Sequence, residues 1–236
     1  MDLTAVLARL RPGAPLAELG LPDAAVWAAL AAGLLVVGVR PLWRVLRVAV
    51  TVVHELGHAV VGVLVGRSFT GLVLRPDMSG HAVTVGRSRG PGRVVTTWAG
   101  YPAPALVGLA LVLAGTSGWS GLATFVVALL LLLGLLRSRS FYTVLVMVAV
   151  LGLSGWLWWA GEERVRGLTL LAVGVVLLLG AWRHLGAVLR APDSGSDLAV
   201  LARLTRLPAA LWTLSFAVVL GGASWVAAGR LVELVR

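Results

Sequence analysis

The sequence predicts an all-α polytopic membrane protein of about six to seven transmembrane helices, with a short β-hairpin inserted after the second apolar run. Composition is the first observation behind this class. The chain is 59% hydrophobic and 13% charged, and its mean hydropathy is +0.95. Soluble domains carry about twice that share of charged residues. The chain contains no cysteine, which excludes disulfides and thiolate metal sites.

A series of apolar runs is the second observation, because each run approaches the roughly 20 residues that cross a bilayer as a helix. No linker between runs is long enough to divide the chain, so we expect a single integral membrane domain over residues 1–236. Residues 1–23 are too charged for a cleavable signal peptide and are predicted to be a lead-in at the membrane surface. The runs cover residues 24–39, 45–66, 97–115, 119–136, 141–160, 167–183 and 209–229.

Residues 67–94 form a polar, glycine-rich segment with a different pattern. Two short β-type runs, 69–74 and 81–85, flank a turn that contains Pro-Asp and Ser-Gly pairs. An isolated hairpin is marginally stable in water, so we expect this one to be held against neighbouring helices.

The positive charge predicts an orientation in the membrane. A net charge of +10 could indicate nucleic-acid binding, but no soluble basic domain is present to bind nucleic acid, and none is expected as a partner. Arginines concentrate in alternate loops, so we expect the hairpin segment 67–94 and a loop with a short helix at 184–207 to be cytoplasmic. Arg40, Arg44 and Arg47 are an exception, because this scheme puts them outside unless they flank a partly inserted segment.

The absence of Lys, Ile, Asn and Gln indicates a GC-rich bacterial source. Together with the apolar runs, it predicts a multi-pass protein of a bacterial plasma membrane.

The stretch Val-Val-His54-Glu55-Leu-Gly-His58-Ala-Val-Val carries the chemistry of the chain. On a helix, two histidines four residues apart share a face, so both imidazoles can bind one metal ion while the glutamate holds a water. Apolar turns on both sides leave no solvated face. A structural explanation would therefore need buried partners for all three polar side chains, and a metal site is the stronger interpretation.

A hydrolytic zinc site needs a third protein ligand and an open position for water. We favour Asp197, which is expected in the first turn of a short helix beginning near residue 198. Asp193 and His184 remain alternatives. His81 is expected to be an ordinary hairpin residue and Asp77 a turn former.

These features resemble the site-2 proteases, a family of intramembrane zinc metalloproteases. The resemblance rests on HELGH at 54–58, the following hairpin, the small-residue and proline stretch WAGYPAPA at 98–105, and an aspartate-bearing loop late in the chain. It implies that His54 and His58 bind Zn²⁺, that an aspartate is the third ligand, and that Glu55 is the catalytic base. The usual Asp-Gly pair is missing, since Leu198 follows Asp197. No PDZ-like insert is present, which is typical of a compact bacterial branch.

The resemblance implies a zinc-dependent endopeptidase that cuts transmembrane segments of other membrane proteins, with the lipid bilayer as its surroundings. The hairpin edge, at 69–74 or 81–85, could pair with an unwinding substrate by strand addition. Two other functions remain open: a catalytically silent membrane scaffold that retains the fold, and a transporter that uses His54, Glu55 and His58 as a proton or metal relay. The oligomeric state is not predicted.

Overall fold

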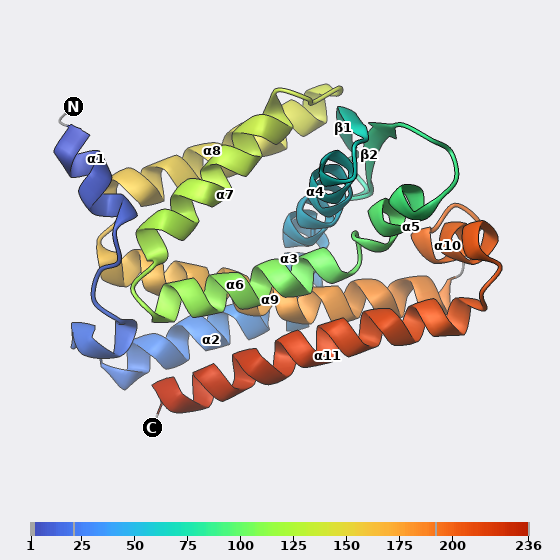
Figure 1. Ribbon diagram of the computed structural model, residues 1–236. Coiled ribbons are helices and arrows are strands. Elements are labelled where there is room, and N and C mark those ends of the chain that lie inside the picture. The colour runs from blue at the N-terminus through green and yellow to red at the C-terminus, as the bar shows by residue number, and fades with distance from the viewer. Residues whose placement is uncertain (1–2, 21, 192, 236) are drawn as a thin grey trace.

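A bundle of long apolar helices forms the body of the protein in a computed structural model that describes residues 3–20, 22–191 and 193–235. Figure 1 shows these helices with the β-hairpin gathered near one end of the bundle. The elements in chain order are α1 (Leu3–Leu10), η1 (Leu16–Leu19), α2 (Asp23–Gly38), α3 (Arg40–Leu46), α4 (Val48–Leu64), β1 (Ser68–Leu74), β2 (Gly80–Val85), α5 (Pro91–Trp98), α6 (Pro102–Thr116), α7 (Ser120–Leu135), α8 (Phe141–Ala160), α9 (Glu163–Arg190), α10 (Asp197–Thr205) and α11 (Ala209–Leu234).

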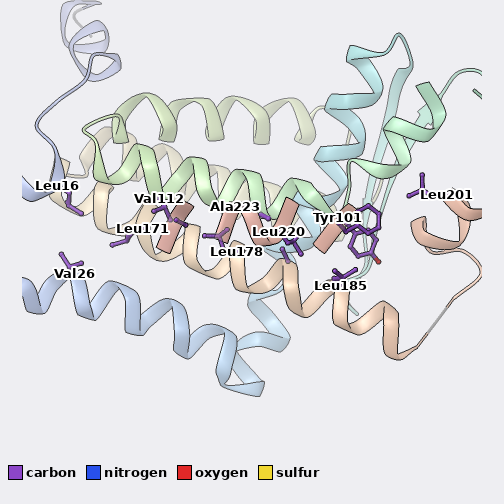
Figure 2. Close-up of a cluster of buried hydrophobic side chains, with 14 residues drawn as sticks. Leu16, Val26, Tyr101, Val112, Leu171, Leu178, Leu185, Leu201, Leu220 and Ala223 are labelled. Carbon is purple, nitrogen blue, oxygen red and sulfur yellow. The ribbon is translucent and has the colours of Figure 1, made fainter. Parts of the chain in front are cut away.

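The main apolar core lies where α6, α9 and α11 pack side by side, with α2 against α9 (Figures 1 and 2). Leu171, Leu178, Phe216 and Leu220 belong to this core. Small residues allow the closest approach. A Cβ on Gly108 would lie 2.8 Å from the Gly174 carbonyl, so glycine is needed where α6 crosses α9. Tyr101 closes the core at the end nearest the hairpin (Figure 2).

The helical membrane fold is confirmed, although fewer helices are long enough to span a bilayer than the six to seven expected. Within the described residues four segments qualify: α3 with α4, α8, α9 and α11. The bent pair of α5 and α6, at 57°, makes a fifth if it counts as one span. Helices α2 and α7 have 16 residues each. At about 1.5 Å per residue they reach about 24 Å, short of the roughly 30 Å hydrocarbon core.

The predicted hairpin is present, and it packs along α4. Strands β1 and β2 are antiparallel, with Leu72 opposite Ala82. Small residues bring the hairpin close to the helix. A Cβ on Gly62 would lie 3.2 Å from Thr84 Cγ2, and one on Gly80 would lie 2.8 Å from both Thr51 and Glu55. The hairpin is therefore stabilised by the metal-site helix, as expected for two strands that would be marginal alone.

Helix α9 continues through Arg190, so the first residues of the expected 184–207 loop are helical. The connection that follows is short, and α10 begins at Asp197. Ser196 caps α10, because its hydroxyl accepts a hydrogen bond from Ala199 N at 3.4 Å.

The segment containing Arg40, Arg44 and Arg47 contacts one end of α9. Arg183, near the end of α9, donates to the Val37 carbonyl and lies over the Trp43 ring at 4.6 Å. The segment therefore lies at the same end of α9 as the loop before α10. On which side of the membrane these arginines lie, and whether they flank a partly inserted segment, stays a prediction.

Candidate metal centre

One face of α4 is polar and buried. His54 and Glu55 are each 6% exposed, and His58 is 9% exposed. Thr51 and Gly62 lie on the same buried face. Three ionisable side chains buried in an apolar helix need compensating partners, so the contacts of each one are informative.

The two histidines and Asp197 converge on one point. His54 Nε2 lies 3.1 Å from His58 Nε2, and Asp197 Oδ2 lies 3.1 Å from the first and 3.0 Å from the second. The three residues form a group that could hold a metal ion. Asp197 comes from α10, more than 130 residues along the chain from α4, so the fold itself assembles this group.

The donor set fits a zinc ion. His58 Nδ1 donates to the Thr96 carbonyl at 2.7 Å, because a carbonyl oxygen can only accept. In a neutral imidazole this leaves Nε2 as a lone pair directed at the cluster. Ligands about 2.0–2.2 Å from a tetrahedral zinc ion lie about 3.3 Å from each other, close to the separations found here. Thr96 thus supplies the outer hydrogen bond that orients a metal-binding histidine.

Gly100 lets the break between α5 and α6 pack closely against the two imidazoles. A Cβ at this position would lie 2.4 Å from His58 Nε2 and 2.7 Å from His54 Cε1. Gly57, which lies between the histidines in the sequence, also allows a close approach. Its Cβ would lie 2.5 Å from Ala103 Cβ, so glycine lets α4 approach the start of α6. Any side chain at position 100 would therefore push the imidazoles from their positions.

The structure separates the residues that were considered as third ligand. Asp197 reaches the histidines, whereas Asp193 is exposed and its carboxylate accepts from Gly195 N at 3.0 Å. His81 and Asp77 are exposed on the hairpin, and Asp77 accepts from Ser79 in the turn. His184 lies against the site, but its contact is a ring stacked on His54 with centroids 4.8 Å apart.

The charge of Asp197 is supported by its neighbours. Burial by itself raises the pKa of its carboxyl group. Without a metal ion, hydrogen bonds from Nε2–H groups of His54 and His58 outweigh burial and hold that pKa below its ordinary value. A bound ion would take the place of these protons and leave Nε2 as the lone pair described above. The carboxylate is therefore ionised, which is the form that binds a metal.

Glu55 is fixed by the hairpin. Its Oε2 accepts a hydrogen bond from Ala82 N at 2.7 Å. Glu55, the two histidines and Asp197 all line one cavity of about 430 Å³, which also borders β2 and the end of α9. A carboxylate held beside a metal-binding cluster in one cavity has the arrangement of a general base.

Sequence reasoning missed two contributors to the site. Tyr101 packs edge-on against His54, with ring centroids 5.1 Å apart, and against His184 at 5.2 Å. The Thr96 backbone carbonyl orients His58. The stretch 98–105 was the only sequence signal nearby, and it indicated a helix start rather than a wall of the site. A backbone carbonyl leaves no signal in side-chain identity.

A helical membrane fold in which a buried His-Glu-His face meets the partly buried Asp197 resembles the site of an intramembrane metallopeptidase. A family model described as Peptidase M50B-like matches residues 27–227, so the chain belongs to this family of metallopeptidases. The match confirms the resemblance to the site-2 proteases. No curated protein and no solved structure gave a significant match to the chain.

Proposed function

We propose that the protein is a zinc-dependent intramembrane endopeptidase that hydrolyses peptide bonds in transmembrane segments of other membrane proteins. The convergence of His54, His58 and Asp197 within 3.0–3.1 Å of one another, with Glu55 in the same cavity, carries this proposal. His54, His58 and Asp197 would hold the ion. Bound Zn²⁺ supplies Lewis acidity, which makes a water nucleophilic near neutral pH.

Glu55 is the residue placed to move protons. One of its oxygens is held by Ala82 N–H, which leaves the other oxygen available to a water molecule. In the proposed reaction Glu55 takes the proton from the attacking water and passes it to the leaving amine. Thr96 keeps the His58 imidazole in the tautomer that presents Nε2 to the site.

The hairpin offers one edge to a substrate. The outer edge of β1 is occupied: Leu72 pairs with Arg137 and Arg139, and Leu74 N bonds to Thr143 Oγ1 at 2.7 Å. The outer edge of β2 borders the cavity, because Gly80 and Ala82 line it beside Glu55. Ala82 N–H on this edge already donates to Glu55, so an added substrate strand would pair with other backbone groups of β2 and lie next to the proposed base.

The end that carries the site is rich in arginine, which favours a cytoplasmic location for it. Because Arg40, Arg44 and Arg47 also lie at this end, a cytoplasmic location would make them agree with the positive-inside rule. The proposal therefore places the protein in a bacterial plasma membrane as a multi-pass protein that cuts near the cytoplasmic side. The bilayer and a transmembrane protein substrate are its proposed partners.

Glu55→Gln tests the catalytic role. The variant should bind zinc like wild type but lose cleavage by roughly 10²–10⁴-fold, the typical contribution of a general base. Bacterial inner-membrane vesicles treated with each protein serve as the substrate source, with new peptide termini in membrane segments mapped by mass spectrometry. Glu233→Gln is the matched control, because Glu233 is exposed and pairs with Arg230 far from the site. Undiminished cleavage by Glu55→Gln refutes this role. Zinc binding without cleavage by wild type favours the scaffold.

A further inference from the structure

A second pocket, of about 330 Å³, lies beside the catalytic cavity and is lined by Arg40, Trp43, Arg44, Arg47 and Arg183. Four of these five residues are arginines, and no carboxylate is among them. Trp43, Arg47 and Arg183 also line the catalytic cavity, so the two spaces adjoin.

Three of the arginines share one face of a continuous helical segment. Arg40, Arg44 and Arg47 are spaced by four and three residues along Arg40–Leu64, so their side chains are neighbours. Like charges at this spacing destabilise a helix. No ion pair neutralises any of them within the described part of the chain, where Arg230 is the arginine that pairs with a carboxylate. The cluster therefore has an excess of positive charge.

Two arginines of the pocket are held in place by other contacts. The Arg183 guanidinium lies 4.6 Å above the Trp43 ring and donates to the Val37 carbonyl. Arg47 donates through Nη2 to the Asp77 carbonyl in the hairpin turn, while its Nε is buried without a hydrogen-bond partner among the described residues. These contacts hold the Arg183 and Arg47 side chains at the wall of the pocket without neutralising their charge.

The other arginine-lined pocket of the molecule shows the contrast. At the opposite end of α9, Arg9, Arg11 and Arg166 border a pocket that also contains Glu162 and Glu163. Arg166 Nε is also buried without a hydrogen-bond partner among the described residues, but two glutamates offset much of the positive charge of that pocket. Near Arg47 the adjacent acidic side chain is Asp77, and its carboxylate is engaged by Ser79.

Exposed apolar side chains near the pocket indicate the kind of anion that it could bind. Leu42, Val45 and Leu46 alternate with the arginines on the same segment and are 43%, 57% and 42% exposed. Exposed apolar side chains beside arginines and a tryptophan, at the end of membrane-spanning helices, are typical of the headgroup level of a bilayer. We propose that the pocket binds the phosphate of an anionic phospholipid, with its acyl chains along Leu42, Val45 and Leu46. Arginine forks bind phosphate oxygens well.

This site would place a lipid headgroup at the entrance of the catalytic cavity. Arg47 contacts both the pocket and the hairpin turn through the Asp77 carbonyl. A phosphate bound beside Arg47 would therefore contact the same residue that anchors the turn. Lipid binding in this pocket does not require the proposed peptidase activity.

The test measures lipid binding to the purified full-length protein by native mass spectrometry and by thermal stability. The probes are phosphatidylglycerol, phosphatidylcholine and inorganic phosphate. Wild type should bind phosphatidylglycerol at least tenfold more tightly than phosphatidylcholine, and inorganic phosphate alone should not stabilise it. Equal stabilisation by inorganic phosphate would overturn the lipid as the source of the anion.

Substitutions locate the site. The triple variant Arg40→Gln, Arg44→Gln, Arg183→Gln should lose at least tenfold in phosphatidylglycerol affinity. The matched control Arg87→Gln, Arg89→Gln, Arg190→Gln removes the same charge from exposed positions and should bind like wild type. The single variant Arg44→Gln, at an exposed position, should lose a smaller but measurable part of the affinity for phosphatidylglycerol. It provides the test if the triple variant does not fold. Unchanged preference in Arg44→Gln and in a folded triple variant overturns the proposal.

Discussion

Two buried regions of the bundle are built in opposite ways. The core between α6, α9 and α11 consists of large apolar side chains and close glycine contacts. The region between α4, β2 and α10 instead holds a buried glutamate, two buried histidines and a partly buried aspartate, each with a directed polar contact. Burial of apolar side chains in the first region stabilises the folded chain. That stability offsets the free-energy cost of holding ionisable side chains close together in the second region.

Asp197→Ala should have the largest effect on the polar region. It removes one of three converging donors, so metal affinity should fall by more than the roughly 10–100-fold typical of changes outside the ligand set. The metal content of each protein after dialysis against a chelator measures this loss of affinity.

Asp193→Ala is the matched control for that change. Asp193 lies on the loop just before α10, and its exposed carboxylate accepts only from Gly195 N, whereas its backbone carbonyl, which the substitution keeps, accepts from Ser196. Equal metal loss in both variants would mean that the loop, and not the Asp197 carboxylate, matters.

Leu171→Ala should affect the apolar region alone. Leu171 is fully buried in α9, and truncating such a residue typically costs about 2–5 kcal/mol. Thermal or denaturant unfolding should show the loss, while the folded fraction keeps the metal stoichiometry of wild type. Loss of metal from folded protein would show that the two regions are not separable.

Gly100→Ala should have a smaller effect, confined to the metal centre. The added methyl group would lie 2.4 Å from His58 Nε2, so the imidazoles must shift, and we expect a loss of about tenfold or more in metal affinity. Titration with a competing chelator provides the measurement.

Gly155→Ala on α8 is its control, because a Cβ there meets nothing within 4 Å. Identical metal affinities for the two glycine variants would contradict the role assigned to the close approach of Gly100 to the imidazoles.

Much of the apolar region could be predicted from the sequence, because hydropathy alone indicates membrane helices. The hairpin was also predictable, since its turn residues and β-type runs are local signals. The full length of α9 could not be predicted, because residues 184–190 are more polar than the apolar run before them and yet are helical. The contact of Arg183 with Val37 and Trp43, which brings α3 to the end of α9, was not predictable either, because it depends on tertiary packing.

The polar region was predictable only in part. HELGH spacing indicates that His54, Glu55 and His58 act together, because a helix alone places them on one face. Asp197 was favoured over Asp193 from its position before a helix, and the structure brings it to the histidines. The roles of Tyr101 and of the Thr96 carbonyl were not predictable, since they arise where the break between α5 and α6 packs on α4.

Zinc content of the purified protein tests the central claim most directly. We expect about one zinc ion per chain in wild type, the stoichiometry of a single three-ligand site. We expect essentially none in a folded His54→Ala, His58→Ala double variant. Wild type that remains metal-free after incubation with zinc, or a double variant that retains the ion, would contradict a zinc site at these residues.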